Sequence, residues 1–239
     1  ELNQEFALGT WYAIGFAGRF YKNHQEYLVP GTPHLDFKYK AVRDFKLSIL
    51  RETAEAGMDG VELDFMRRLP HFAEPDCEIM TQFMRDCRQM LDAVGTSQNR
   101  RLEVMARMPW TGCMEQGLDW KTWMQEGLVD SVAVTFRDYG SRFAIPVDEF
   151  VEMGRKTGCK VYGCVWFDLG LVSHDPTPEG RIRYAKPKTR EMFYAEALVY
   201  HHAGAETDRG VDSGRCVDFR TGLVAARRTP GSAKRGMPA

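Results

Sequence analysis

Apolar residues along the chain follow two different spacings, and the two spacings alternate. In longer segments they recur every three to four positions, which is typical of helices with one buried face. In shorter segments they follow one another or alternate with polar residues, which is typical of buried strands. The first spacing predicts helices over residues 41–57, 75–95, 119–130, 146–158 and 188–205. The second spacing predicts strands over residues 59–65, 101–109, 131–136 and 160–167.

Helices and strands therefore alternate about four times, with connections of only a few residues. Such alternation predicts parallel βαβ units, which wind in one direction because their crossovers are right-handed. The result is either a closed barrel or an open, doubly wound sheet. No GxGxxG motif follows a strand, which disfavours a dinucleotide-binding fold. A (β/α)8 TIM-type barrel is favoured by polar residues at the carboxyl ends of the predicted strands, where such barrels form their active sites. These residues are Asp64, Arg107, Arg137 and Asp168.

The last segment of the chain, residues 206–239, follows neither spacing. It carries a net charge of +3, whereas residues 1–205 carry −4, and no acidic residue occurs from Phe219 onward. We predict a partial (β/α) barrel domain of catalytic type over residues 1–205 and an irregular or disordered tail over residues 206–239. A sharper hypothesis is that this tail is a truncated or out-of-frame end rather than native sequence.

Composition narrows the classes of function. The chain has 239 residues, of which 44% are hydrophobic and 27% charged, and this is ordinary for one globular domain. Its net charge of −1 gives no reason to expect nucleic acid or an anionic membrane as a partner. No segment reaches the ~18 consecutive apolar residues of a membrane helix. The six cysteines form no CxxC motif, and we interpret them as buried free thiols.

Two acidic residues, Glu62 and Asp64, are the first candidates for catalysis. Side chains two residues apart on a strand share a face, so both acids point into the predicted barrel while their apolar neighbours face the helices. Paired carboxylates in a partly dry site suit general acid catalysis, and glycoside hydrolysis uses two such groups. The strand-end position makes Asp64 the better candidate. Glu62 is either its partner carboxylate or a scaffold residue that pairs with Arg107.

Further candidates lie in loops and at the other predicted strand ends. Asp168 is a second carboxylate that we expect across the barrel from Asp64. Arginines keep neighbouring carboxylates ionised, and aromatic rings stack on the apolar face of a sugar. The candidates for substrate binding are Arg67, Arg107, Trp110, Arg137, Tyr139, Trp166 and His24. Core packing is the alternative for Trp166 and a solvated loop charge is the alternative for Arg67, while His71 is expected to be structural or exposed.

Motifs for a metal or cofactor are missing from the sequence. It has no HxH or HExxH, and His201 and His202 are adjacent on a predicted helix, so they face different ways. A GxSxG nucleophile elbow is missing as well. We therefore predict no metal and no cofactor. A metal-dependent lyase or isomerase stays open as an alternative, because clustered carboxylates also bind divalent cations.

Three ordered motifs resemble those of bacterial glycosyl-hydrolase-like TIM-barrel proteins. The segments FYKNHQEYL, LDFKYKAVRDF and DGVELDFMRR match an HPEW-like segment, a DxxxPxVRD-like helix start and a DGIxLD strand followed by an RxP loop. His24, Glu26 and Tyr27 match the first motif, with Gln25 where proline is usual. The residues that match the other two motifs are Asp36, Val42, Arg43, Asp44, Asp59, Gly60, Glu62, Asp64, Phe65, Arg67 and Pro70.

The resemblance, which covers roughly residues 10–205, implies a glycoside hydrolase that acts on a polysaccharide or glycan and is secreted or periplasmic. It makes the strand with Asp64 the fourth of eight, whose end supplies the acid/base carboxylate in related retaining barrels. The strand 160–167 becomes the seventh, which places Asp168 near the nucleophile. The barrel would be incomplete, with about five of eight βα units. A carbohydrate-binding barrel without catalysis is the alternative.

Overall fold

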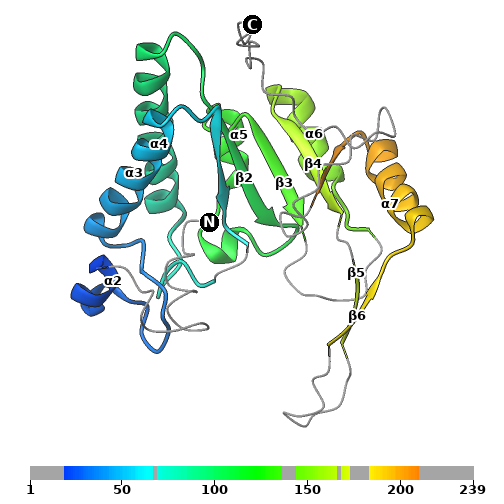
Figure 1. Ribbon diagram of the computed structural model, residues 1–239, viewed down its shortest axis with the longest axis horizontal. Coiled ribbons are helices and arrows are strands. Elements are labelled where there is room, and N and C mark those ends of the chain that lie inside the picture. The colour runs from blue at the N-terminus through cyan, green and yellow to red at the C-terminus, as the bar shows by residue number, and fades with distance from the viewer. Residues whose placement is uncertain (1–18, 67–68, 136–143, 166–167, 173–182, 210–239) are drawn as a thin grey trace, which may run out of the picture.

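The computed structural model of the protein describes residues 19–66, 69–135, 144–165, 168–172 and 183–209. Its centre is a five-stranded parallel sheet in the order β1-β2-β3-β4-β7 (Figure 1). The strands are β1 Gly60–Asp64, β2 Glu103–Pro109, β3 Ser131–Thr135, β4 Lys160–Val165 and β7 Glu206–Arg209. Parallel pairing of the first four strands in chain order confirms the predicted βαβ units. The described strands form an open sheet, not a closed barrel.

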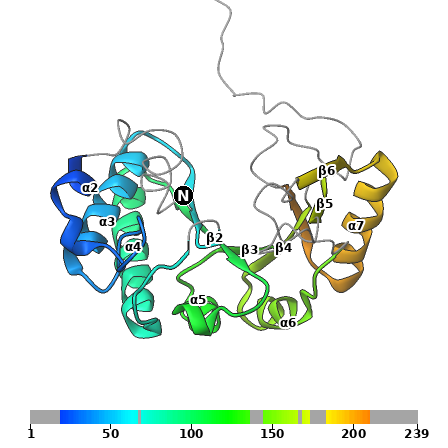
Figure 2. The ribbon, with the colours of Figure 1, turned by 90° about the horizontal axis from the view of Figure 1, so that it is seen from below.

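Helices connect the strands and cover one face of the sheet. They are α2 Arg19–Asn23, α3 Lys40–Glu55, α4 Cys77–Ser97, α5 Trp120–Gln125, α6 Asp148–Thr157 and α7 Arg190–Ala203, with the 3-10 helices η2 Gln25–Tyr27 and η3 Met114–Gln116. In Figure 2 the sheet curves, and helices α3 to α7 follow its outer, convex side. None of the described helices covers the concave side in this view.

Local signals in the sequence account for most helix boundaries. Asp76 caps the start of α4, where its side chain accepts a hydrogen bond from a backbone nitrogen of the first turn. Gly158 ends α6 with a φ of +81°, a conformation that L side chains rarely adopt. The predicted helix 119–130 proved too long, because α5 stops at Gln125 and Gly127 turns the chain with a φ of +66°.

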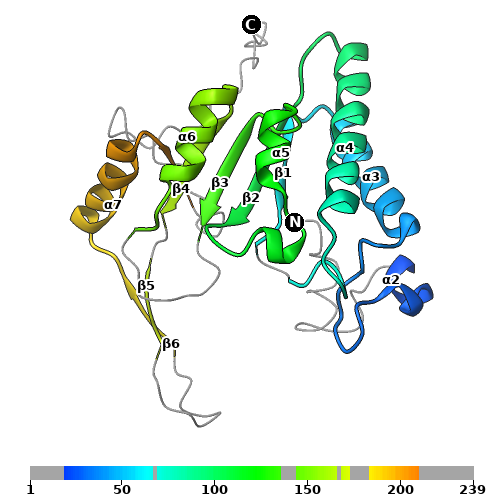
Figure 3. The ribbon, with the colours of Figure 1, turned by 180° about the vertical axis from the view of Figure 1, so that it is seen from behind.

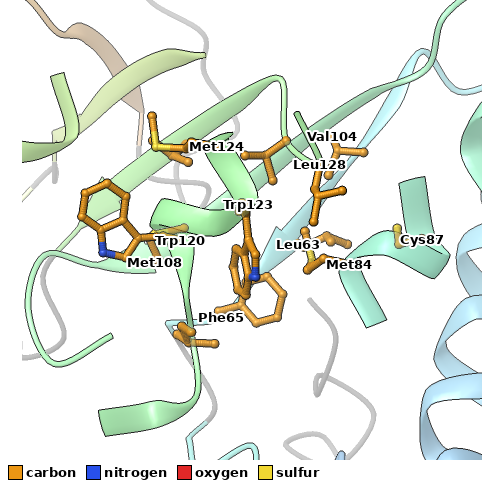
Figure 4. Packing of buried hydrophobic residues seen from close by; sticks show 14 of the residues in the cluster. Leu63, Phe65, Met84, Cys87, Val104, Met108, Trp120, Trp123, Met124 and Leu128 are labelled. Atoms are coloured by element: carbon orange, nitrogen blue, oxygen red, sulfur yellow. The ribbon is translucent and has the colours of Figure 1, made fainter. Parts of the chain in front are cut away.

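The apolar core lies between the sheet and the helices. Leu63 and Phe65, the neighbours of Asp64 in the chain, are fully buried in it. The ring of Trp123 from α5 lies 5.2 Å from that of Phe65 (Figure 4). The indole nitrogen of Trp123 donates a hydrogen bond to Thr81 of α4 at 2.9 Å. This packing fixes the end of β1 against two helices.

Two strands form a separate antiparallel hairpin, β5 Asp168–Val172 and β6 Arg183–Pro187. The hairpin extends away from the five-stranded sheet beyond the end of β4 (Figures 1 and 3). The predicted strand 160–167 with Asp168 at its end therefore needs a correction. Strand β4 already ends at Val165, and Asp168 begins β5 because its backbone pairs with Pro187 of the returning strand.

Strand β7 lies in the segment that the sequence predicted to be irregular. Residues Glu206–Arg209 pair in parallel with β4, from Tyr162 to Val165. The prediction was wrong for this strand, because backbone hydrogen bonds to the edge of β4 need no apolar pattern. Residues 210–239 lie outside the described residues, so the irregular tail and the domain boundary stay predictions.

Candidate functional site

Polar residues of the sheet gather on its concave face. Asp64 is in register with Arg107, Arg107 with Ala133, and Ala133 with Tyr162. Residues in register in a parallel sheet point to the same side, so these four side chains form one row across β1 to β4. Glu62 lies two residues before Asp64 on β1 and therefore shares this side. The sequence had predicted that the two acids share a face, and the alternation along β1 is the reason that they do.

Arg107 links the two acids. Its Nη1 lies 3.8 Å from a carboxylate oxygen of Glu62 and 3.8 Å from one of Asp64. The Asp64 side chain is only 3% exposed and its Oδ1 accepts a hydrogen bond from the Met66 backbone nitrogen at 2.9 Å, whereas the Glu62 side chain is 34% exposed. Asp64 is therefore held in one orientation by the backbone, and Glu62 faces solvent.

The charge on Arg107 is maintained despite its burial. Burial lowers the pKa of this guanidinium, but Cys164, Asp64 and Glu62 together outweigh that effect and raise it above its usual value. A guanidinium that stays protonated offsets one of the two negative charges on the carboxylates. The cluster of Glu62, Asp64 and Arg107, called here the acid–arginine cluster, carries a net charge of −1 when both acids are ionised.

His71 supports the end of β1 from the core side. Its Nε2 lies 3.0 Å from the Phe65 carbonyl oxygen and donates a hydrogen bond to it. Burial is the main cause that lowers the pKa of His71 to about 4, so the ring is neutral near pH 7. The expectation of a structural rather than catalytic histidine fits this position, because its hydrogen bond fixes the backbone immediately after Asp64.

Asp36 supports the same loop, a role that the sequence analysis missed. Its two carboxylate oxygens accept hydrogen bonds from the backbone nitrogens of Lys38, at 3.0 Å, and Ala73, at 3.3 Å. The backbone nitrogen of Phe37 also donates to the His71 carbonyl oxygen at 2.9 Å. The signal that was available is the acidic residue two positions before Lys38, which is typical of an Asx turn. The contact with Ala73 spans 37 residues and has no local signal.

The other predicted site residues are distributed unevenly. Trp110 follows β2, is partly buried, and donates its backbone N–H to the Thr135 carbonyl oxygen at 3.0 Å. His24 pairs with Glu26 and packs against the rings of Phe20 and Tyr27, which places it beside α3 rather than in the acid–arginine cluster. Asp168 begins the hairpin. The remaining candidates lie outside the described residues; they are Arg67, Arg137, Tyr139 and Trp166.

The described residues offer no metal site and no membrane-spanning helix beside the acid–arginine cluster. No group of three or more His, Cys, Asp or Glu side chains in them is arranged to hold a metal ion. None of the described helices combines the length and apolar character needed to cross a bilayer. The cysteines in the described ranges are free thiols; Cys87, Cys113, Cys159 and Cys164 are buried, as predicted, whereas Cys77 is partly exposed.

Comparison with known proteins finds likeness in structure only. No family model and no curated protein matches the sequence. A glycoside hydrolase family 18 N-acetylglucosaminidase from Paenibacillus barengoltzii is similar over 64% of this chain and 52% of its own, with 16% identity and a TM-score of 0.40. The protein ydhD from Bacillus subtilis, described as a putative sporulation-specific glycosylase, is similar over 77% of this chain and 68% of its own, with 15% identity and a TM-score of 0.43.

The glycoside hydrolase domain of PelA from Pseudomonas aeruginosa is similar over 56% of this chain and 53% of its own, with 16% identity and a TM-score of 0.35. The chain spans about half the length of the N-acetylglucosaminidase. TM-scores this low do not support transferring residue roles or a reaction to this chain. The functional proposal below rests on the acid–arginine cluster instead. The solved structures to which this chain is similar include glycoside hydrolases, the class of protein that its sequence motifs resemble.

Proposed function

We propose that this protein is a glycoside hydrolase that acts on a polysaccharide or glycan. The observation that carries the proposal is the placement of Glu62 and Asp64 on one face of a parallel sheet, each 3.8 Å from the same arginine nitrogen. Asp64 is also the last residue of β1. The carboxyl ends of parallel strands are where (β/α) folds place their catalytic side chains.

The proposed mechanism gives the two carboxylates different tasks. Asp64, in its protonated form, is the general acid, which protonates the glycosidic oxygen as its bond to the anomeric carbon breaks. The partner carboxylate either bonds to that carbon, after which Asp64 acts as the base for the water that releases the sugar, or itself activates the attacking water. Glu62 is the partner carboxylate, with Asp168 as the other candidate. Because Glu62 and Asp64 each have an oxygen 3.8 Å from Arg107 Nη1, these oxygens lie no more than twice that distance apart. Such a separation accommodates the ~5 Å of retaining enzymes and the shorter end of the ~6.5–9.5 Å range of inverting enzymes.

Other residues of the proposed site either fix the orientation of Asp64 or bind the sugar. The Met66 backbone N–H fixes one oxygen of Asp64, so the rotamer of this acid is set before substrate arrives. Arg107 offsets part of the negative charge and, with Trp110, lines the sugar site. Arg67, Arg137, Tyr139 and Trp166 are proposed to complete the site from the loops that follow β1, β3 and β4.

We propose that the sheet is part of a (β/α)8 barrel. Two features support this: helices cover only the convex side of the curved sheet (Figure 2), and the described sheet ends in two open edges, β1 and β7. Open edges expose unpaired backbone groups, and closure into a barrel is one way in which proteins remove them. In a closed barrel, the concave face with the acid–arginine cluster becomes the lumen.

The proposal is tested with Asp64→Asn in the full-length protein. Release of reducing ends from a polysaccharide panel should fall by about 10²- to 10⁴-fold, which is the usual contribution of a general acid/base. The melting curve should stay close to that of the wild type. Asp44→Asn is the matched control, because Asp44 is an exposed carboxylate that pairs with Lys40 on α3. Equal turnover by wild type and Asp64→Asn would remove Asp64 from the mechanism.

A second candidate is a carbohydrate-binding barrel without catalysis. It is favoured by the same ion pairs, because acids that neighbour an arginine also make hydrogen bonds to sugar hydroxyls without transferring protons. The two candidates differ in one measurement. Glycan binding without release of reducing ends, by wild-type protein over long incubation, favours the binding function.

A further inference from the structure

His24 and Glu26, from the motif FYKNHQEYL, form a hydrogen-bonded pair that has no role in the acid–arginine cluster. His24 Nδ1 lies 3.0 Å from a carboxylate oxygen of Glu26. The pKa of Glu26 is below its usual value, mainly because of this hydrogen bond, so the carboxylate is ionised near pH 7 and can only accept. Nδ1 is therefore the donor, and Glu26 determines which nitrogen of the ring carries that proton.

Aromatic neighbours fix the plane of the His24 ring. Its centroid lies 4.6 Å from that of Phe20 and 5.1 Å from that of Tyr27, and the planes of His24 and Tyr27 differ by only 11°. Phe20 in turn stacks on Phe45 of α3 at 4.1 Å. The side chain of His24 is nevertheless 37% exposed and that of Glu26 is 59% exposed. The His24–Glu26 pair is therefore held in one orientation and is accessible to a ligand.

The second ring nitrogen of His24, Nε2, forms no hydrogen bond with any of the described residues. Because the Nδ1 proton points to Glu26, Nε2 accepts a hydrogen bond when the ring is neutral and donates one when it is protonated. A sugar hydroxyl both donates and accepts, so it fits either state. The exposed Glu26 carboxylate is a further acceptor, and the partly buried ring of Tyr27 offers apolar surface to the C–H face of a sugar.

The His24–Glu26 pair lies at the same end of the sheet as Asp64. The Asp36 backbone N–H donates to the Tyr27 carbonyl oxygen at 2.8 Å, and the Asp36 carboxylate accepts from Ala73 in the loop after β1. The motif is thereby attached to the loop that follows Asp64. In Figure 1, α2 lies toward the end of the molecule to which the strand arrows point. A glycan chain bound at Asp64 can therefore continue along this end of the molecule to His24.

We propose that the His24–Glu26 pair is a distal subsite, which binds a sugar unit of the same glycan chain away from the bond that is cleaved at Asp64. This inference rests on the proposed glycoside hydrolase function and specifies its substrate as a chain that extends beyond the acid–arginine cluster. His24 Nε2 and the Glu26 carboxylate bind hydroxyls of this distal sugar, and Tyr27 contacts its apolar face. The affinity for a glycan should therefore increase once the chain is long enough to reach the pair.

The test is the dependence of binding on chain length. Linear oligosaccharides of glucose, N-acetylglucosamine and galacturonate, from the disaccharide to the heptasaccharide, are titrated by calorimetry into full-length protein that carries Asp64→Asn, so that bound chains are not cleaved. The affinity should rise about tenfold at one step in length, because the subsite adds one or two net hydrogen bonds. Adding His24→Phe should abolish this step, since phenylalanine keeps the ring stack but has no nitrogen. Adding Glu26→Gln should reduce it, because the amide no longer directs the His24 proton.

A matched control and a spectroscopic measurement separate ligand contact from folding. Glu152→Gln should keep the length step, because Glu152 is likewise an exposed carboxylate in an ion pair but lies on α6. In protein labelled with nitrogen-15 histidine, the His24 Nε2 resonance should shift when the heptasaccharide is added and stay in place when the disaccharide is added. A pair that only stabilises the fold would show no shift that depends on chain length.

Two results would overturn the inference: an affinity that does not rise with chain length, or a length step that His24→Phe leaves intact. If His24→Phe does not fold, Glu26→Gln and the Nε2 resonance decide. Release of reducing ends by the wild type is measured separately. Hydrolysis without a length step overturns this inference and supports the hydrolase proposal, whereas a step that depends on His24 without hydrolysis does the reverse. No binding by any oligosaccharide overturns both.

Discussion

Two clusters of charged residues in the described part of the chain are built differently. In the first, Lys188 Nζ donates a hydrogen bond directly to Glu196, and their side chains are 2% and 0% exposed. In the second, the acid–arginine cluster, Arg107 lies 3.8 Å from each of two carboxylates and one of these is partly exposed. The first cluster is a direct pair with both side chains buried, and the second is a looser group of three charges with one partly exposed member.

The difference follows from where each cluster lies. Glu196 is on α7, next to Tyr200, whose ring packs against the backbone of Gly163 on β4. Lys188 comes directly after β6, so its pair with Glu196 ties the end of the hairpin to α7. The acid–arginine cluster lies instead on the face that the described helices leave uncovered (Figure 2). We infer that the Lys188–Glu196 pair serves stability, whereas the acid–arginine cluster serves ligand binding and catalysis.

Lys188→Met should have the largest effect on the free energy of unfolding, because it removes one member of the buried pair. Above about pH 7, where Glu196 is ionised, the change leaves this buried carboxylate without its counterion, which costs about 3–5 kcal/mol in comparable buried pairs. The free energy of unfolding, measured by urea titration, should fall by that amount. Lys156→Met is the matched control, because Lys156 forms an exposed pair with Glu152 and such pairs contribute less than about 1 kcal/mol. A loss no larger than that of the control would show that the buried pair does not hold the hairpin end.

The stability of the protein should depend on pH through two buried groups, Glu196 and His71, whose effects have opposite signs. Burial raises the pKa of Glu196 from 4.5 to about 7, although Lys188 opposes the rise. The contribution of Glu196 to stability is therefore full below about pH 4.5 and is lost as pH rises to about 7. Burial lowers the pKa of His71 from 6.5 to about 4, so its contribution is full above about pH 6.5 and is lost as pH falls to about 4.

The two slopes overlap and partly cancel in the wild type. In Glu196→Gln only the His71 effect remains, so the free energy of unfolding should rise between about pH 4 and 6.5. In His71→Gln only the Glu196 effect remains, so the free energy of unfolding should fall between about pH 4.5 and 7. Urea midpoints measured at half-unit pH intervals give both slopes. Parallel profiles for the two variants would contradict the assignment of these groups.

The smallest effect is expected for Glu62→Gln on stability. The Glu62 side chain is 34% exposed and 3.8 Å from Arg107, so its ion pair is screened by solvent. We expect a change in the free energy of unfolding of less than about 1 kcal/mol. Glycan turnover or binding should change strongly in the same variant, because Glu62 belongs to the proposed site. A large loss of stability with normal turnover would move Glu62 from the site to the scaffold.

Much of the sheet could be predicted from local pattern. The alternation of DGVELDF determines that Glu62 and Asp64 share one face while Leu63 and Phe65 enter the core. Helix starts such as Asp76 and stops such as Gly158 were also readable, because capping and left-handed turns need particular residue types within a few positions. These features depend only on neighbours in the chain.

Other features depend on segments that are distant in the chain, and no local sequence pattern predicts them. Strand β7 forms from the polar sequence ETDR because the edge of β4 offers backbone hydrogen bonds. Asp168 enters a hairpin because β6 returns beside it, and Asp36 is buried because its carboxylate meets Ala73 across the loop after β1.

The sequence by itself therefore determined the elements, their parallel arrangement and the face on which the two acids lie, because side-chain alternation and capping are local. Only the tertiary structure decided which charges meet. Register across β1 and β2 brings Arg107 to Asp64, while packing of α7 brings Glu196 to Lys188. The physical reason is that strand register and helix packing set distances between side chains that are far apart in the chain. Those distances decide whether a buried charge is already paired or still able to bind a ligand.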